Sequence, residues 1–128
     1  RMVEALMPAV RGRVATLNEA HFKAQVKRVS IRDNSSRWGS CSRDGSISLN
    51  MRLLFMPEAI LDYVIVHELA HTRYRGHGPR FWALVGSVMP DHIERRRWLK
   101  ENGWAVPATD IPHRKGQQTL TDFAEEPY

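Results

Sequence analysis

The sequence contains very little cysteine and no long apolar stretch, and each absence excludes a class of protein. Cys41 is the only cysteine among the 128 residues. A single thiol cannot form an internal disulfide, which excludes a disulfide-stapled secreted scaffold and fits a reducing environment. No apolar run approaches the roughly 20 residues that a membrane-spanning helix needs. We therefore expect a cytoplasmic protein without a membrane segment.

Length and composition are those of one ordinary globular domain. The chain of 128 residues is 42% hydrophobic and 26% charged, which suits a single modest core. The formal net charge of +5 favours acidic partners, nucleic acid among them, although a solvated basic surface explains the same excess. No internal repeat is apparent.

The first half of the sequence predicts a helix followed by a small sheet. Apolar residues at helical spacing over residues 1–22 are interrupted by Pro8, so one helix is expected after this proline. Segments 25–32, 36–42 and 46–50 carry strand patterns, and we expect three short antiparallel strands. The pair Asp44-Gly45 between the last two is a strong hairpin signal.

The second half predicts helices and then a tail. A helix is expected from Pro57, which suits a first turn, to Arg75, with Gly76 as its C-terminal cap. Two shorter helices follow, one after Gly78-Pro79 to about Val88 and one from Asp91 to Asn102-Gly103. Residues 105–128 contain three prolines and few aliphatic residues. The prediction is an α+β domain over residues 1–104 and a flexible C-terminal tail over 105–128.

Two histidines and a glutamate stand in the longest of these helices. His67 and His71 are four residues apart, so their side chains leave one helix face about 5–6 Å apart. Two imidazole nitrogens can then reach one zinc ion at about 2.0–2.1 Å. Glu68 is rotated by about 100° and can address a water molecule on that metal. This is the H-E-x-x-H arrangement of metal-dependent hydrolases.

A catalytic zinc ion needs three protein ligands and one open position. His77 follows directly after Gly76, which ends the helix and lets the chain fold back, so His77 is the preferred third ligand. His92 and Glu94 are alternatives. Core histidines satisfied by hydrogen bonds would explain the pattern without a metal, while a purely structural zinc site is disfavoured because Cys41 is alone.

A wider set of motifs resembles a known family. H-E-L-A-H, a histidine six positions later, G-P-R-F-W, M-P-D and E-R-R-R-W-L-K resemble the YgjP-like zinc metallopeptidases, relatives of the SprT-like and WLM proteases. The upstream segments S-R-W-G-S-C-S and D-G-x-I-x-L-N stand in the same order. The resemblance covers about residues 29–98. It departs at Met51, where such sequences commonly have Trp.

The resemblance implies a zincin-like minimal domain with one Zn²⁺ ion. The implied ligands are His67, His71 and His77, with Glu68 as the catalytic base. The β-rich part that precedes this domain in the family has no counterpart in the chain, so we expect residues 1–104 to lack an N-terminal part.

The implied function is hydrolysis of peptide bonds by a zinc-bound water, with Glu68 as general base. SprT-like relatives act on proteins crosslinked to DNA, which adds an expected link to DNA metabolism or repair by analogy of fold. The alternative is a metal-stabilised, non-catalytic adaptor that docks to DNA or a sliding clamp. A metal hydrolase acting on a non-peptide amide is a third hypothesis.

The segment from Arg37 to Cys41 is the expected substrate side. Gly39 in a strand pattern indicates a bulge or a close backbone approach, and an edge strand beside the zinc helix can pair with an extended peptide. The expected substrate contacts are Arg37, Trp38, Gly39 and Ser40, and the alternative is a hairpin packed by Trp38. Cys41 is expected to be a small buried residue rather than a nucleophile.

Other polar residues have weaker assignments. Candidates for stabilising the oxyanion are Tyr74, Arg73 and His92, each of which could equally be a packing or surface residue. A basic rim for DNA could form from Arg95, Arg96, Arg97, Lys100, Arg73, Arg75 and Arg80, or these could be solvated faces.

The tail contains a short motif of its own. Gln117, Leu120 and Phe123 match the Q-x-x-L-x-x-F core of a sliding-clamp-binding peptide, in which Leu120 and Phe123 would enter a pocket. Ala124 stands where a second aromatic residue is usual. The expected partners are thus a peptide substrate, DNA and a sliding clamp.

Overall fold

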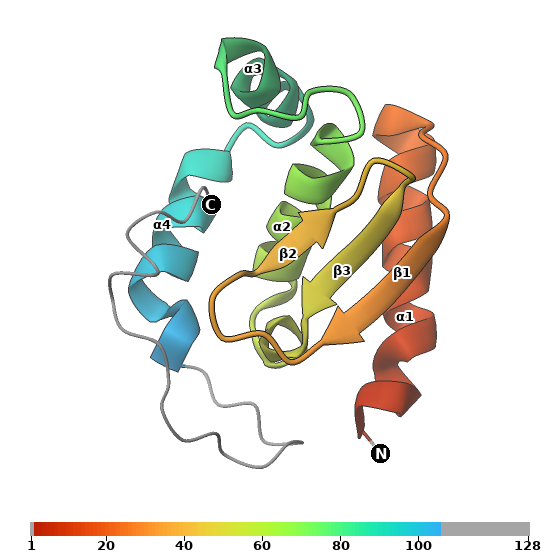
Figure 1. Cartoon of the computed structure of the whole chain (residues 1–128). Helices are drawn as coiled ribbons and strands as arrows, with labels where there is room; N and C mark the ends of the chain where they lie inside the picture. Colours follow the sequence, from red (N-terminus) through yellow and green to blue (C-terminus); the bar gives the residue numbers. More distant parts are fainter. Residues whose placement is uncertain (1, 106–128) are drawn as a thin grey trace.

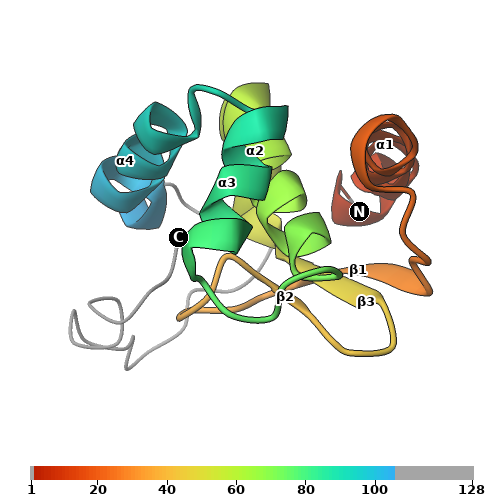
Figure 2. The same cartoon turned by 90° about the horizontal axis from the view of Figure 1, so that it is seen from above.

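The computed structural model describes residues 2–105. Its long helices all lie on the same side of a small sheet (Figures 1 and 2). The long helices are α1 (Met2–Leu17), α2 (Glu58–Ala70), α3 (Pro79–Val88) and α4 (His92–Asn102). The strands are β1 (Arg28–Arg32), β2 (Gly39–Cys41) and β3 (Ser46–Asn50). Short helical turns complete the described chain: η1 (Asn18–Phe22), η2 (Met51–Phe55) and η3 (Gly103–Ala105). The predicted α+β fold is confirmed.

The sheet is mixed rather than antiparallel, which corrects the prediction. Its order is β1-β3-β2. The hairpin of β2 and β3 is antiparallel as expected, with Gly45 at a φ of 89°, but β1 pairs with β3 in parallel. The strand lengths also differ, since the predicted strand 36–42 is shortened to Gly39–Cys41.

The loop between β1 and β2 explains this topology. Asn50, the last residue of β3, is 1% exposed, and its amide nitrogen donates to the carbonyl oxygens of Asn34 and Arg37 at 2.6 and 2.8 Å. The loop is therefore held across the end of β3, and β2 returns on the far side of that strand. Asn34 also accepts from the backbone N–H of Ser36 at 2.8 Å, a local turn that the strand pattern did not show.

Helix α1 runs through Pro8 without a break, so the expected start after this proline was wrong. Proline removes one helical hydrogen bond, but Val10 and Val14 on the following turns are both 2% exposed and hold the helix against the core. Arg13 ties α1 to α2, because its guanidinium donates to both carboxylate oxygens of Asp62 at 2.7 Å.

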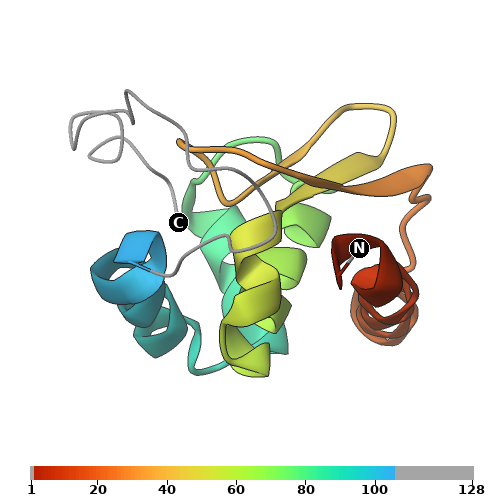
Figure 3. The ribbon, with the colours of Figure 1, turned by 90° about the horizontal axis from the view of Figure 1, so that it is seen from below.

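Helix α2 is the central helix and lies over the sheet, with α1 on one side of it and α4 on the other (Figures 2 and 3). It ends at Ala70, five residues before the predicted end at Arg75. The hydroxyl of Thr72 donates to the carbonyl oxygen of Leu69 at 2.6 Å and so occupies an acceptor of the last turn. The chain then leaves the helix before Gly76.

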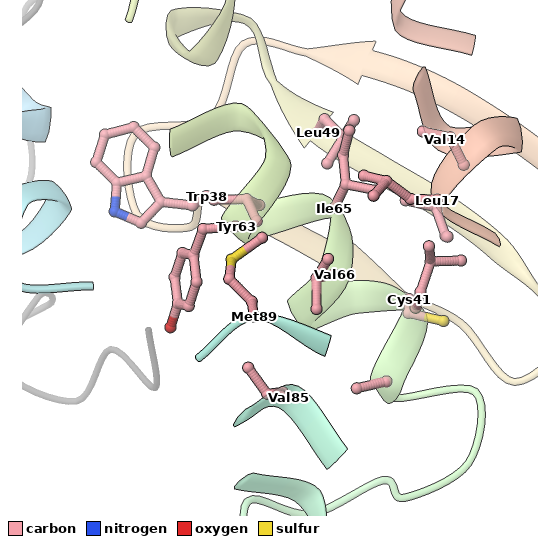
Figure 4. Packing of buried hydrophobic residues seen from close by; sticks show 14 of the residues in the cluster. Val14, Leu17, Trp38, Cys41, Leu49, Tyr63, Ile65, Val66, Val85 and Met89 are labelled. Carbon is pink, nitrogen blue, oxygen red and sulfur yellow. The ribbon is translucent and has the colours of Figure 1, made fainter. Parts of the chain in front are cut away.

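Side chains from every layer meet in one core, shown in Figure 4. It includes Val14 and Leu17 from α1, Leu49 from β3, Ile65 and Val66 from α2, and Val85 from α3. Ile47 and Leu49 are both 1% exposed, as the hairpin pattern predicted. Fully burying each aliphatic side chain of this kind contributes about 1.5–3 kcal/mol.

Trp38 and Trp104 close the core beneath α4. Trp38 is 1% exposed and stacks on Trp104 with ring centroids 4.0 Å apart. Gly103 leaves room for this pair, since a Cβ atom there would lie 2.6 Å from Cζ2 of Trp38. The helix α4 follows Asp91 as predicted, but the Asp91 carboxylate pairs with Arg95 at 3.0 Å instead of capping the helix.

None of the helices described between residues 2 and 105 combines the length and the apolar character needed to cross a bilayer.

Candidate metal centre

His67 and His71 lie on one side of α2, as their spacing predicted. His67 belongs to the last helical turn and is 0% exposed, and His71 follows the helix as its C-cap at 8% exposure. Although His71 lies outside the helix, its backbone keeps helical angles (φ −68°, ψ −13°), so the two rings remain 5.0 Å apart. The shortened helix therefore leaves this pair intact.

His77 joins them from the loop that follows α2. Its Nε2 lies 3.1 Å from Nε2 of His71 and 3.3 Å from Nε2 of His67. Two nitrogens bound to one tetrahedral zinc ion at 2.0–2.1 Å would be about 3.3 Å apart. Ligand nitrogens of the three residues all lie within 4.8 Å of one another, so the donor set fits a single small cation.

The ring of His71 is held in the orientation that a metal ligand needs. Its Nδ1 lies 2.9 Å from the carbonyl oxygen of Tyr74, which can only accept a hydrogen bond. The proton is therefore on Nδ1, and the lone pair of Nε2 points at His67 and His77. A backbone carbonyl that fixes the tautomer of a ligating histidine is a usual feature of metal sites.

All three imidazoles favour the neutral form. Burial lowers the pKa of His67 well below its usual range, and the neighbouring histidines and Arg96 add to this effect. Burial is also the main cause of the lowered pKa of His71 and of His77. Because only neutral imidazole binds a metal ion, the site is prepared for one near neutral pH.

Glu68 lies beneath the edge strand β2. Its side chain is 1% exposed, and a Cβ atom added at Gly39 would lie 3.0 Å from Glu68 Oε2 and 3.0 Å from the carbonyl oxygen of Ser48. The close backbone approach expected at Gly39 is therefore confirmed. The absence of a side chain at Gly39 makes room for the carboxylate.

Helix α3 forms an aromatic wall around the histidines. The ring of Phe81 stacks on His71 at 4.5 Å and meets His67 edge-on at 5.0 Å. Trp82 lies 5.8 Å from His67 and 6.0 Å from His77. In the sequence these two residues were noted only as part of the motif G-P-R-F-W, so their position at the site was missed.

The chain matches the family model of the YgjP-like metallopeptidase domain over residues 2–102. It belongs to the YgjP-like metallopeptidase family. The recognised resemblance is thus confirmed, and the protein is a metal-dependent hydrolase of peptide bonds by class. No curated protein sequence matches the chain.

A solved structure shares the fold. The chain is similar to the metallopeptidase zymogen abylysin of Pyrococcus abyssi, with a TM-score of 0.64 and 24% sequence identity. The match covers 72% of this chain and 93% of abylysin. At this level of identity the likeness concerns the fold alone.

The alternative third ligands lie elsewhere in this YgjP-like domain. His92 stacks on Trp82 with ring centroids 5.7 Å apart, and Glu94 is exposed on α4. Within residues 2–105, the only group of three potential ligands close enough for one ion is His67, His71 and His77. The structure therefore favours His77 among the candidates.

Two of the three candidates for the oxyanion, Arg73 and His92, are engaged in other contacts. Arg73 donates to the carbonyl oxygen of Phe22 at 2.8 Å, and His92 packs on Trp82. Tyr74 is 36% exposed. Arg96, which the sequence placed only in a basic run, lies over the Trp82 ring at 5.5 Å and helps to lower the pKa of His67 and His77. Its position depends on the packing of α4 and was not visible in the sequence.

The four expected substrate contacts divide into two kinds. Arg37 and Ser40 are exposed, whereas Trp38 and Gly39 are buried. Trp38 packs the hairpin, which is the alternative that the sequence left open. Cys41 is 8% exposed, and burial raises the pKa of its thiol, as expected for a small core residue.

The basic residues do not form one continuous rim. Arg95 is bound to Asp91 and to the carbonyl oxygen of Ala59, while Arg96 lies over Trp82. Arg73 and Arg75 instead face a cavity at the other end of the site. The clamp motif at Gln117, Leu120 and Phe123 lies outside the described residues.

Proposed function

We propose that this metallopeptidase is a zinc enzyme in which His67, His71 and His77 hold one ion and Glu68 acts as the general base. The observation that carries the proposal is the convergence of three imidazole nitrogens, two of them 3.1 and 3.3 Å from Nε2 of His77. Three histidines without cysteine are a typical ligand set of catalytic zinc, which keeps one position open.

The open position is expected on the side of His77. His67 and His71 are buried, but His77 is exposed. Solvent and substrate are therefore expected to reach the three nitrogens from the loop side, while Phe81 packs against all three rings. This asymmetry suits a catalytic site better than a closed structural one.

Glu68 would carry the proton through the reaction. A zinc ion in this place would lower the pKa of water and polarise the scissile carbonyl. The Glu68 carboxylate accepts the proton of the attacking water and then donates it to the amine that leaves. Its burial beside Gly39 keeps the carboxylate in one position without a competing solvent shell.

The substrate is expected to bind along β2 as an extended peptide. β2 is an edge strand, since β3 pairs with it on one side only. Asn50 donates to the carbonyl oxygen of Trp38 and Ser42 donates to that of Ser46, so the ladder to β3 uses alternate residues of the strand. Gly39 and Cys41 consequently direct their main-chain groups away from β3, and the carbonyl oxygen of Cys41 accepts a hydrogen bond from Arg75 there at 2.7 Å. Addition of a peptide strand at such an edge supplies main-chain hydrogen bonds independent of sequence.

A matched pair of variants tests the role of Glu68. Glu68→Gln should retain one zinc ion per chain but lower the cleavage rate of a peptide library by about 10²–10⁴-fold, the usual contribution of a general base. Glu94→Gln makes the same change at an exposed position of α4. It is the control and should retain both zinc and activity. Undiminished cleavage by Glu68→Gln would remove Glu68 from the mechanism.

Three finer assignments remain predictions. A role in DNA metabolism is supported by the net charge of +5, and stimulation of proteolysis by DNA would test it. If the protein binds a sliding clamp through Gln117, Leu120 and Phe123, truncation of the tail should abolish that binding. A cytoplasmic location fits the single cysteine and is tested by microscopy of the tagged protein.

A further inference from the structure

A cavity of about 740 Å³ adjoins the histidine cluster at the end of the sheet. His71 lines it, together with the turn after α2, the tip of the β2–β3 hairpin and the segment after η1. The lining residues that matter most are Lys23, Arg43, Asp44, His71, Arg73 and Arg75. Its volume is within the range of about 300–1,000 Å³ that ligand pockets usually have.

The cavity carries an excess of positive charge. Lys23, Arg43, Arg73 and Arg75 line it, against one carboxylate, that of Asp44. Asp44 is already occupied, because Lys27 lies 3.3 Å from it and the hydroxyl of Ser42 donates to it. Hydrogen bonds from Ser42, Ser46 and Lys27 lower the pKa of Asp44, so its carboxylate is ionised, and its charge is paired with Lys27, which does not line the cavity.

Two of the arginines are held in place by neutral acceptors. Arg75 donates to the carbonyl oxygens of Cys41 at 2.7 Å and His71 at 3.3 Å, and Arg73 donates to that of Phe22 at 2.8 Å. Carbonyl oxygens orient a guanidinium without offsetting its charge, and its five N–H donors leave some for a ligand. In the described part of the chain, no ion pair involves either arginine or the exposed Arg43.

The cavity lies on the line of the proposed substrate. β2 begins at Gly39, beside Glu68, and leads through Cys41 to Ser42 and Arg43 at the cavity. The four steps from Gly39 to Arg43 would span roughly 13 Å if the chain were fully extended. A peptide paired with β2 would thus bring a side chain a few positions from the cleaved bond to the four cations.

We infer that this cavity is a specificity subsite that accepts the carboxylate of an aspartate or glutamate side chain of the substrate. The inference rests on the proposed peptidase function and deepens it. Arginine binds carboxylates through paired N–H donors, which suits a fixed guanidinium. A groove for nucleic acid would need cations in an extended row, whereas these four surround one concavity next to His71.

Matched peptides test this subsite. Fluorogenic peptides that differ only in having Glu, Gln or Lys at one position are compared for each position around the cleaved bond. The zinc-loaded wild-type enzyme should show, at one position, a kcat/KM about fivefold higher for Glu than for Gln, the size expected of a partly exposed ion pair. Lys at that position should be cleaved more slowly still.

Charge-reversal variants then test whether the cations of the cavity cause the preference for Glu. Arg43→Glu and Lys23→Glu change exposed side chains that make no described hydrogen bond, so the fold should be retained. Each should abolish the preference for Glu and improve cleavage of the Lys peptide. Arg11→Glu, an equal change of charge on α1 outside the cavity, is the control and should keep the wild-type preference.

The outcomes separate this inference from the proposed function. The subsite is overturned if the active enzyme cleaves the three peptides at equal rates, or if its preference for Glu persists in both Arg43→Glu and Lys23→Glu. Either result leaves the peptidase function unaffected. If no peptide is cleaved, binding of the labelled peptides to zinc-loaded Glu68→Gln decides: tighter binding of the Glu peptide, lost in Arg43→Glu, supports the subsite. Binding of an oligonucleotide is measured in the same variants. If Arg43→Glu weakens oligonucleotide binding more than it weakens binding of the Glu peptide, the cavity is a nucleic-acid site and the inferred subsite is overturned.

Discussion

The apolar core residues of α2 and the polar residues of its last turn are equally buried, yet their surroundings differ in kind. Ile60, Val64 and Ile65 are between 0% and 3% exposed and contact only the apolar core. His67 and Glu68 are 0% and 1% exposed, but they are polar. Buried polar groups are stable only with suitable partners, so His67 and Glu68 depend on particular neighbours, whereas these apolar side chains need only a well-packed core.

Those particular neighbours come from three other segments. Gly39 on β2 makes room for Glu68, the carbonyl oxygen of Tyr74 fixes His71, and the loop after α2 brings His77. Changes in the first turns of α2 should therefore affect stability, and changes around the last turn should affect chemistry. The predictions below test this separation.

The largest expected effect on stability comes from the apolar half. Ile65→Ala should lower the free energy of unfolding by about 2–5 kcal/mol, since it leaves a cavity beside side chains that cannot fully close it. Ile65 is 0% exposed and belongs to the apolar core, not to the group formed by the three histidines. Denaturant unfolding measures the loss, and zinc content at low temperature should remain one ion per chain. Loss of zinc from folded Ile65→Ala would contradict the separation.

Two glycines give a sharper contrast of intermediate size. A Cβ at Gly39 would press on Glu68, while one at Gly103 would lie 2.6 Å from Trp38 Cζ2. Gly103→Ala should cost about 1–3 kcal/mol of stability through overpacking with normal kcat per folded molecule. Gly39→Ala should lower kcat by about tenfold or more, because a displaced general base loses part of its contribution.

Gly12→Ala is the control for both glycines. No atom lies within 4 Å of a Cβ added at this helical position, so alanine should stabilise the protein by about 0.5–1 kcal/mol. Equal effects of the Gly39 and Gly103 variants on kcat would show that the site and the core are not separable in this way.

The smallest expected effect is a pH dependence of the metal-free protein. The pKa values of His67, His71 and His77 are lowered in the folded state, mainly by burial. Below about pH 6.5, the usual pKa of histidine in an unfolded chain, the unfolded chain binds more protons than the folded protein. The stability that the neutral rings contribute is therefore complete above that pH and is lost as the pH falls through the lower folded pKa values. For the buried His67 the slope approaches 1.4 kcal/mol per pH unit, and the more exposed rings contribute less.

Urea unfolding of chelator-treated protein measures this slope. His67→Phe, which keeps a ring of similar shape in the apolar pocket, should flatten it. A slope that stays unchanged in His67→Phe would assign the pH dependence to other groups.

Local patterns predicted much of this molecule because local physics determines those parts. The Asp44-Gly45 hairpin was found from turn chemistry, since Gly45 adopts a positive φ that other residues disfavour. The pair His67 and His71 followed from helical periodicity alone. His77 lies beside this pair as expected, but the predicted cap at Gly76 was wrong, because α2 ends at Ala70 and Gly76 has no positive φ.

The parts that were missed depend on contacts between distant segments. The parallel pairing of β1 depends on Asn50, which holds a loop that begins sixteen positions earlier in the chain. The end of α2 depends on the hydroxyl of Thr72, whose competition with the helix has no periodic signal. The places of Trp82 and Arg96 at the site depend on how α3 and α4 pack, which no pattern within either helix contains.

X-ray absorption spectroscopy at the zinc edge tests the central claim most directly. Protein loaded with one zinc ion should show three imidazole nitrogens at about 2.0–2.1 Å and one light oxygen ligand. His77→Ala should lose one imidazole from that shell, while His92→Ala should leave it unchanged. A wild-type spectrum with two imidazoles, or an unchanged spectrum in His77→Ala, would contradict the three-histidine centre.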